Sequence, residues 1–424
     1  MNANLIILNS SIITDICNAY TVEDAHKIYT TNIDRLSGWK FILAASAGFM
    51  PGFAINKTFS NGAAIRSLFA SDHFFVLDEL TVQEMNNFGT ANISYDYSIS
   101  FDTMAISYIM PFLENRNNPP TKDFIEVFNF IARNNVNVDP IPYILENQCN
   151  LSDAFKIDKI FKKLLGYEIL CSINLDRLIN SGYISSNLSE QELMYNAQQL
   201  MSRIIYDSED KNFTRENYKL QRLMYCILLK MVAIQFNLQK MFVPEKLAKF
   251  IEFLDNDLCS VFARELIVAL EYFERGSNLK FFGKIHPNRS DIFDNLKNMA
   301  WDLLHVRLCE KALTYNVEKD IRYNFPAFLT FDKALVEIIE LYPLKSCAIS
   351  PDGAAIPFYS RNMQEVLANA LGQTCFFNIL ELFTIDATKK RNSRHNKNNN
   401  LIEPLIYELE NIVATLANVD VPKS

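Results

Sequence analysis

The stretch Tyr97-Ser-Ile-Ser-Phe-Asp-Thr-Met-Ala-Ile-Ser-Tyr-Ile109 decides the fold. Apolar Ile99 and Phe101 alternate with serines, which is the period of a β-strand with two different faces. From Thr103 onward the apolar residues recur at three- and four-residue spacing, which is typical of a helix. The sequence therefore predicts a strand that ends at Asp102 and leads directly into a helix.

A second stretch, residues 325–342, repeats this arrangement. Ala327–Phe331 predicts a strand and Lys333–Leu341 predicts a helix, with Asp332 between them. In open α/β sheets, ligands bind beyond the carboxyl ends of the strands. We therefore expect the carboxylates of Asp102 and Asp332 to be able to meet at one point.

A third candidate acid, Asp302, lies in the predicted helix Asn298-Met-Ala-Trp-Asp-Leu-Leu-His305. It interrupts an apolar pattern, and an acid among apolar neighbours is costly to bury unless it is paired or binds a cation. His305 follows one turn later on the same helix face. It could orient a phosphate or a water there, although a core or surface histidine is the plainer interpretation.

Two glutamates compete for a further acidic position. Glu146 follows a short predicted strand at Asn135–Val138, and Glu265 lies at the edge of the apolar face of another predicted helix. Carboxylates gathered around one point repel each other, and Mg²⁺ or Mn²⁺ relieves this repulsion because both prefer oxygen ligands. Such a metal polarises a phosphoryl oxygen and activates a water, which is the chemistry of phosphodiester hydrolysis.

Three segments resemble the PIN-domain nucleases. Phe101–Ile109 is similar to the opening of that family, in which the first strand ends in an Asp followed by Thr. Trp301–His305 and Phe328–Asp332 resemble its closing pair, in which one Asp lies on a helix and the next follows a strand in a "Thr, one residue, Asp" pattern. The resemblance covers about residues 95–150 and 255–350.

The resemblance implies a metal-dependent nuclease that uses Mg²⁺ or Mn²⁺ and acts on RNA first and DNA second. It also allows a toxin or phage-defence effector that an inhibitory partner protein holds in check. The implied catalytic and metal-binding residues are Asp102, Glu146 (or Glu265), Asp302 and Asp332. Cations near these acids could contact phosphate, although solvated charges are their default role: Arg264, Lys297, Arg307 and Lys333.

Each acid also has a plainer role. Asp102 and Asp332 could be N-caps of the helices that follow them, a common role for Asp. Asp302 could pair with Arg307 or Lys297, and the two glutamates could be surface or bridging residues. The alternative for the whole chain is therefore a helical interaction or scaffold protein with a degenerate, metal-free PIN-like core.

The composition bounds these hypotheses. The chain has 424 residues, of which 49% are hydrophobic and 21% charged, so it is globular. Its net charge of -8 argues against a broad nucleic-acid-binding surface, but a metal-holding carboxylate cluster is itself acidic. The eight cysteines and five histidines are not spaced for zinc, and neither a Walker loop nor a G-x-S-x-G elbow occurs. The most apolar window, Phe41–Ile55, is too short to span a bilayer, so we expect a cytoplasmic protein without membrane contact.

The fold that follows is α/β. We expect a three-layer PIN-like core with a parallel sheet, a large α-helical insertion and an N-terminal α/β segment. The predicted parts are the N-terminal segment 1–95, the first part of the core 96–150, the insertion 151–255, the second part of the core 256–387, a basic Asn-rich linker 388–400 and a C-terminal helix 401–424.

Overall fold

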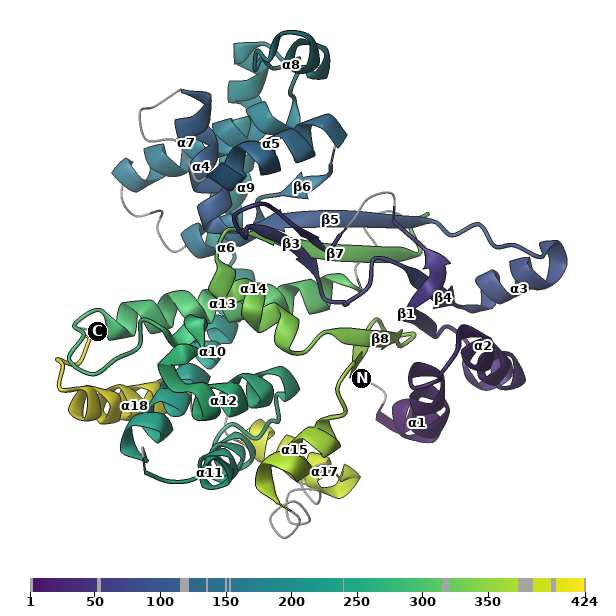
Figure 1. Ribbon diagram of the computed structural model, residues 1–424, viewed down its shortest axis with the longest axis vertical. Helices are drawn as coiled ribbons and strands as arrows, with labels where there is room; N and C mark the ends of the chain where they lie inside the picture. The colour runs from purple at the N-terminus through teal and green to yellow at the C-terminus, as the bar shows by residue number, and fades with distance from the viewer. Residues whose placement is uncertain are drawn as a thin grey trace. The chain divides into compact units, whose positions relative to one another are not determined.

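A computed structural model of the chain divides into two compact units (Figure 1). Unit 1 comprises Met1–Arg215, Val306–Val336 and Pro343–Phe358, and unit 2 comprises Glu216–His305, Glu337–Tyr342 and Tyr359–Ser424. The structure describes residues 3–51, 55–114, 122–134, 136–148, 151, 154–238, 240–314, 320–372, 384–397 and 402–422. Both units combine segments that are far apart in the sequence, so the boundaries expected near residues 95, 150 and 255 do not separate them.

A five-stranded mixed sheet organises unit 1. Its central strand β5 (Tyr95–Phe101) lies between β7 (Tyr323–Thr330) and β6 (Val138–Asp139) and runs parallel to both. On the far side of β7, β3 (Ala64–Ser67) and then β2 (Lys57–Thr58) are added in antiparallel pairing. The α/β class is therefore confirmed, with parallel strands at the centre and antiparallel strands at one edge.

The central strands follow from their side chains. Ile99 and Phe101 on β5 are buried, whereas Ser98 and Ser100 on its other face are half-buried, as the alternation predicts. Every residue of β7 is buried, so both faces of this strand are covered. A strand buried on both faces has an apolar sequence without alternation. Ala327–Phe331 has this pattern.

A second, four-stranded sheet belongs to the same unit. Its order is β4 (Phe74–Leu77), β1 (Lys40–Phe49), β8 (Leu344–Ile349) and β9 (Ala355–Tyr359), and β1 is antiparallel to both β4 and β8. The N-terminal segment is thus joined to residues some 300 positions later. The helices α1 and α2, which span Ala3–Cys17 and Val22–Thr31, contribute to a buried core with Trp39, Phe41 and Leu77.

Aromatic rings pack the two sheets of unit 1 against each other. The ring of Phe325 on β7 lies 4.5 Å from that of Phe74 on β4 and 5.8 Å from that of Phe49 on β1, measured between centroids. Phe49 in turn lies 5.2 Å from Tyr95 on β5. Aromatic pairs at these distances add to the stabilisation that comes from burial alone.

Helices of unit 1 gather beyond the β6 edge of the five-stranded sheet (Figure 1). They are α4 (Thr103–Leu113), α5 (Lys122–Asn134), α6 (Ile141–Asn147), α7 (Ala154–Cys171), α8 (Leu175–Ser181) and α9 (Glu190–Glu209), while α3 (Glu79–Phe88) follows β4. The predicted helix after Asp102 is confirmed as α4. Gly166 lets α7 approach α4 closely, since a Cβ there would meet the Cγ of Met110 at 2.7 Å.

Unit 2 is helical. Its helices are α10 (Lys211–Asn237, which begins in unit 1), α11 (Val243–Asn256), α12 (Ala263–Arg275), α13 (Ile292–Ala312, which ends in unit 1), α14 (Lys333–Leu341, which begins in unit 1), α15 (Met363–Leu371), α17 (Ile385–Lys397) and α18 (Ile402–Ala417). The helix predicted at Lys333–Leu341 is confirmed as α14.

The basic segment expected to be a linker is helical from its start at residue 388 to Lys397 in α17; residues 398–400 lie outside the described residues. Two of its arginines account for the difference. Arg391 and Arg394 donate to the two oxygens of Asp255 at 3.0 and 2.9 Å. Asp255 is buried on α11, so this pairing holds the first part of the basic segment in place, which no local pattern in the sequence indicates.

Asp123 on α5 anchors the turn between β2 and β3. Its carboxylate is buried and accepts the backbone N–H groups of Asn61 and Ala63, at 2.5 and 2.8 Å. We expect Asp123→Ala to destabilise unit 1 by about 2–3 kcal/mol, because two bonds to a charged acceptor are lost and the buried N–H of Ala63 is left without its acceptor. Urea unfolding followed by circular dichroism measures this loss.

Glu126 provides a matched control on the same helix. It accepts the N–H of Ser60 at 2.9 Å, in the same turn but at the surface. Since water replaces a lost surface bond, Glu126→Ala is expected to cost less than about 1 kcal/mol. Equal losses of unfolding free energy for the two variants would show that burial does not increase the contribution of the Asp123 hydrogen bonds to stability.

Candidate functional site

Two predicted acids lie at the carboxyl ends of adjacent parallel strands. Asp102 follows β5 and Asp332 follows β7, and these strands pair in register up to Phe101 and Leu329 (Figure 1). The N–H of Asp102 donates to the carbonyl of Leu329 at 3.1 Å, so the ladder of hydrogen bonds continues up to the acid itself. The expectation that both acids stand at one edge of the sheet is met in unit 1.

The Asp102 carboxylate is buried and hydrogen-bonded. Its Oδ1 accepts the N–H of Ala105, which makes Asp102 the N-cap of α4. Its Oδ2 accepts the hydroxyl of Thr330 at 2.6 Å and the N–H of Phe331 at 3.3 Å. The carboxylate therefore joins the start of α4 to the end of β7, and the proposed capping role of Asp102 is present.

Thr330 connects the two acids. Its hydroxyl donates to Asp102 and accepts the N–H of Asp332 at 3.0 Å. The Oδ1 of Asp332 accepts the N–H of Ala334 at 2.7 Å, in the first turn of α14. The "Thr, one residue, Asp" pattern thus sets the relative position of the two acids, and Asp332 also serves its helix as a cap.

Aromatic packing holds this segment of chain in place. The ring of Phe331, between Thr330 and Asp332, lies 5.3 Å from Tyr108 on α4 and 6.0 Å from Phe124 on α5. Since three elements contribute to this cluster, the loop after β7 cannot move without disturbing α4 and α5. The two acids are therefore fixed by packing as well as by hydrogen bonds.

Glu146 acts electrostatically on Asp102. It lies on α6, which packs against both β5 and α4. Burial raises the pKa of Asp102, and the negative charge of Glu146 raises it further, to about 6, although the donors Thr330, Ala105 and Phe331 oppose this. The two carboxylates are close enough to repel each other, which is the condition that a bound cation would relieve.

A lysine that the sequence analysis did not consider stands beside these acids. Lys163 on α7 donates to the hydroxyl of Ser107 on α4 at 2.7 Å, and its ammonium lies 5.2 Å from the ring centre of Tyr143. Burial and the neighbouring Lys159 lower the pKa of Lys163, while Glu146 raises it. No motif in the sequence points to Lys163, because its position results from the close packing of α7 on α4.

A second missed residue, Asp139, ends β6. Its Oδ2 accepts the hydroxyls of Ser98 and Ser100 on β5, the latter at 2.9 Å, and its Oδ1 accepts the N–H of Ile141 at 3.0 Å. All three parallel strands therefore end in an aspartate. The Asp-Pro pair at the end of a short strand was the available signal for it.

The remaining predicted acids belong to unit 2. Glu265 is fully buried on α12, and Asp302 is half-buried on α13. The predicted set is thus divided between the units, and its members in unit 1 are Asp102, Glu146 and Asp332. His305 is buried with its ring stacked on Trp301 at 6.0 Å, as a core histidine would be.

The predicted phosphate-binding cations have other contacts. Arg264 is buried beside the ring of Tyr359, and Lys297 lies over the ring of Tyr225. Arg307 pairs with Glu310 at 2.6 Å. Lys333 is exposed at the start of α14, one residue after Asp332. Of the four, Lys333 is the one that stands next to a predicted acid of unit 1.

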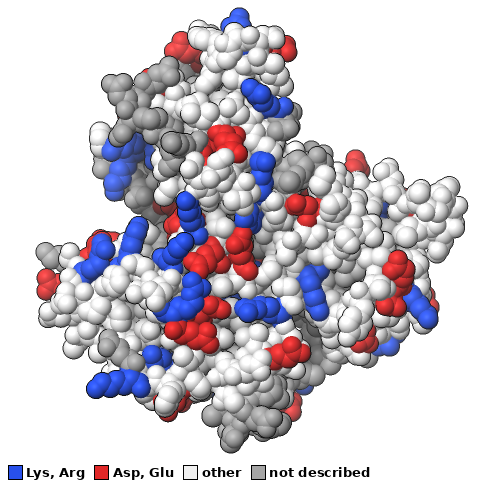
Figure 2. Space-filling view, in the orientation of Figure 1, with Lys and Arg blue, Asp and Glu red and all other residues white. Residues whose placement is uncertain are grey.

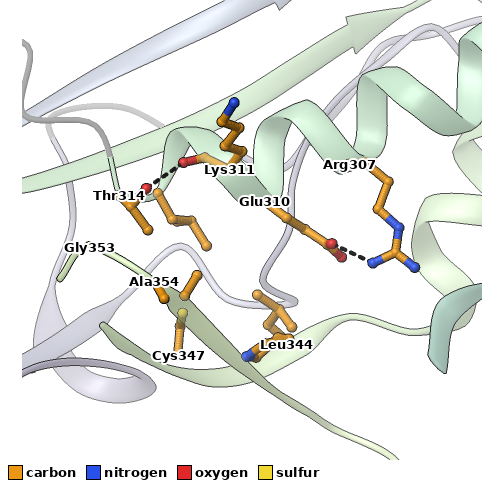
Figure 3. Close-up of a pocket in the computed structure, with 11 residues that line it drawn as sticks. Arg307, Glu310, Lys311, Thr314, Leu344, Cys347, Gly353 and Ala354 are labelled. Atoms are coloured by element: carbon orange, nitrogen blue, oxygen red, sulfur yellow. Dashed lines mark hydrogen bonds and ion pairs between the residues drawn. The ribbon is translucent and has the colours of Figure 1, made fainter. Parts of the chain in front are cut away.

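A surface cavity of about 320 Å³ lies elsewhere in unit 1, where the end of α13 meets β8 and β9 (Figure 3). Its wall carries the Arg307–Glu310 ion pair, and the hydroxyl of Thr314 donates to the carbonyl of Lys311 at 2.8 Å. None of the predicted acids lines it. The chemistry of the carboxyl edge, and not this cavity, therefore defines the candidate site.

Within the described part of the chain, no group of three or more His, Cys, Asp or Glu side chains is arranged to hold a metal ion. The hydroxyl of Thr103, next to Asp102, is buried and has no hydrogen-bond partner among these residues. Figure 2 shows acidic and basic side chains interspersed over the face that it draws. The candidate site contains the carboxylates of Asp102, Glu146 and Asp332, the ammonium of Lys163 and the hydroxyl of Thr103.

Comparisons of the chain with family models, with curated proteins and with solved structures find no match. The resemblance to PIN-domain nucleases therefore depends on the short motifs around Asp102, Asp302 and Asp332. None of the helices that the structure describes is long and apolar enough to cross a membrane.

Proposed function

We propose that this chain is a metal-dependent nuclease that hydrolyses phosphodiester bonds, in RNA before DNA, with a PIN-like core at the carboxyl edge of β7, β5 and β6. One observation carries the proposal. A buried carboxylate, Asp102, stands at the end of the central strand with its pKa raised to about 6, and Glu146 contributes to that rise. Perturbed acids at the carboxyl ends of parallel strands are candidates for a catalytic site.

Mg²⁺ or Mn²⁺ fits two carboxylates. Mg²⁺ is usually held by one or two protein carboxylates, with waters and substrate phosphates completing its shell. Asp102 and Glu146 would supply the two carboxylates. The Oδ1 of Asp102 accepts a hydrogen bond from the N–H of Ala105, and its second lone pair could face the cation. The cation would polarise a phosphoryl oxygen and activate a water.

The other residues of the site have roles that follow from their contacts. Thr330 and the caps of α4 and α14 orient the carboxylates of Asp102 and Asp332. Lys163 donates a hydrogen bond to Ser107, and its charge interacts with that of Glu146. This ammonium would offset negative charge on a phosphate. Asp302 and Glu265, which lie on helices of unit 2, stay predicted metal ligands.

Thermal unfolding with Mn²⁺ tests the proposed cation site. A ligand that binds only the folded state stabilises it by about 2.7 kcal/mol at 100 times its Kd. We therefore expect Mn²⁺ to raise the melting temperature of the wild type by several degrees and to leave the variant Asp102→Asn/Glu146→Gln unchanged. Cleavage of a fluorescent single-stranded RNA should follow the same pattern.

The control removes equal charge elsewhere in unit 1. Asp15 and Glu23 are exposed acids on α1 and α2, so Asp15→Asn/Glu23→Gln should keep the full Mn²⁺ shift. If the shift is absent from the wild type, or if the site variant keeps it, the cation site proposed at Asp102 and Glu146 does not exist.

The second candidate function is that of an interaction or scaffold protein. One observation favours it: Asp102 and Asp332 both cap helices, so their positions have a structural explanation without a metal. Exposed Tyr195 and Tyr206 on α9 would then contribute to a binding surface. A wild type that folds, shows no Mn²⁺ shift and cleaves neither RNA nor DNA would favour this function over hydrolysis.

A further inference from the structure

The first half of α7 is strongly basic in an otherwise acidic chain. Residues 154–163 contain four lysines and one acid, Asp158, whereas the whole chain carries a net charge of -8. Lys156 and Lys159 are exposed. Lys162 pairs with Asp158 at 2.8 Å, so the remaining three lysines give this part of the helix its positive charge.

Those three lysines lie on one face of α7. Lys156, Lys159 and Lys163 are separated by three and four residues, which places them above one another along the helix. Seven residues correspond to about 10 Å of helix, so the row is long enough to contact more than one phosphate of an extended strand. The lowering of the pKa of Lys163 by Lys159 agrees with this proximity.

The row ends at the candidate site. Lys163 is its last member, and its ammonium donates to Ser107 on α4, one turn after the Asp102 cap. Glu146 acts electrostatically on both Lys163 and Asp102. The positive row therefore leads from the exposed start of α7 to Ser107 on α4, the helix that Asp102 caps.

An exposed aromatic ring flanks the start of the row. Phe155 is 64% exposed, and the ammonium of Lys159 lies 4.2 Å from its ring centre. Proteins that bind single-stranded nucleic acid combine a positive track for the backbone with aromatic rings on which bases stack. A duplex has its bases paired and stacked internally, so an exposed ring favours a single strand.

We propose that α7 is the binding track for a single-stranded nucleic acid, with backbone phosphates on Lys156 and Lys159 and a base stacked on Phe155, and that this track leads the strand to Asp102 and Glu146. The proposal deepens the proposed function and rests on it for the fate of the strand. Binding itself does not require hydrolysis, so the two can be tested separately.

Fluorescence anisotropy with a labelled 12-nucleotide single-stranded RNA measures this binding. The full chain carries Asp102→Asn and the buffer contains EDTA, so that the probe stays intact. Each phosphate contact on a single strand contributes about 0.7 to the slope of log affinity against log salt. Adding Lys156→Gln/Lys159→Gln should therefore reduce the steepness of that slope by about 1.4 and weaken binding roughly tenfold near 0.1 M salt.

Two further variants separate charge from stacking. Phe155→Leu keeps an apolar side chain and should weaken binding about fivefold or more without changing the salt slope, because stacking is lost and charge is not. Lys280→Gln/Lys284→Gln removes two exposed lysines of unit 2, with the same change in net charge. This control should bind within about twofold of its parent if the effect belongs to α7 and not to overall charge.

Three results would overturn the proposal: no binding of the probe, equal losses for the α7 pair and the unit 2 pair, or tighter binding of a duplex than of the single strand. If binding depends on the α7 lysines but the wild type cleaves neither RNA nor DNA, the binding track is supported and the proposed nuclease activity is refuted. If the wild type cleaves in a metal-dependent way but its binding does not depend on the α7 lysines, the nuclease activity is supported and the binding track is refuted.

Discussion

Replacing Asp102 with asparagine is expected to lower metal-dependent hydrolysis at least about a hundredfold while the chain stays folded. A metal that polarises a phosphoryl oxygen contributes several kcal/mol to the transition state, and each 1.36 kcal/mol is a factor of ten in rate. Asparagine retains one oxygen for the N–H of Ala105, so α4 keeps an N-cap. The negative charge that would hold the cation is lost. Initial rates of RNA cleavage with Mn²⁺ measure the effect.

The same variant is expected to change how stability depends on pH. The carboxyl pKa of Asp102 is raised from 3.8 to about 6 on folding. The folded state therefore binds the proton more tightly, so this group contributes stability below about pH 4 that is lost as pH rises through about 6. A pKa that rises by about two on folding corresponds to about 3 kcal/mol of unfolding free energy. Asparagine does not titrate and lacks this loss.

Urea unfolding in EDTA at pH 4 and pH 7 measures this difference. Relative to wild type, Asp102→Asn should gain about 2 kcal/mol of unfolding free energy between the two pH values. Asp15→Asn, at an exposed position, should show no comparable gain. A stability difference between Asp102→Asn and wild type that is constant with pH would mean that Asp102 is not held with a raised pKa.

Replacing Asp78 with alanine is expected to cost the most stability. Asp78 caps α3 by accepting the N–H of Thr81 at 2.7 Å, and it also accepts the hydroxyl of Tyr323 at 2.8 Å. The guanidinium of Arg322 donates to both of its oxygens and to the carbonyl of Asn92. The network thus ties α3 to the start of β7, at the opposite end of that strand from Asp332.

Replacing Asp78 removes the nearer of the two acids that face Arg322 and leaves its mostly buried charge with Glu84 alone, at 3.8 Å. The side chains of Arg322 and Asp78 are 15% and 10% exposed. Removing one partner of a buried pair typically costs about 3–5 kcal/mol, so Asp78→Ala is expected to lower the unfolding free energy of unit 1 by this amount. The double variant Asp78→Ala/Arg322→Met should lose less than the sum of the two single variants.

Glu84 supplies the control for this prediction, because it faces the same arginine at 3.8 Å and is 24% exposed. Glu84→Ala should cost less than about 1 kcal/mol. Burial alone would raise the pKa of Asp78, but the bonds from Thr81, Arg322 and Tyr323 lower it overall. The stability from this network is therefore present above about pH 4 and is lost as pH falls below it. Equal costs for Asp78→Ala and Glu84→Ala would contradict this account.

The sequence predicts the elements around Asp102 and Asp332 because their patterns are local. Alternation in β5 and the apolar run in β7 identify two strands, and the acid after each marks a helix start. β8 and β9 are not predicted. Leu344–Ile349 is buried without alternation and Ala355–Tyr359 contains a proline, so neither has a clear strand pattern. The pairing of β8 with β1 spans some 300 residues, and no local pattern carries that register.

The residues of the candidate site likewise fall into those that local sequence patterns predict and those that depend on packing. Asp102 and Asp332 could be placed together because parallel strands end at one edge of a sheet. Glu146 and Glu265 could both be proposed from their helices, but the packing of α6 against β5 and α4 could not be predicted. Lys163 and Ser107 could not be found at all. Their contact depends on Gly166 allowing two helices to approach closely, which is a property of three-dimensional packing.

The position of a manganese ion in crystals of the protein tests the central claim most directly. Data collected at the manganese absorption edge, from crystals soaked with Mn²⁺, should show an anomalous peak roughly 2.0–2.6 Å from carboxylate oxygens of Asp102 and Glu146. The peak should vanish in Asp102→Asn. A peak at other residues, or none near these two carboxylates at a concentration that supports cleavage, would contradict the account.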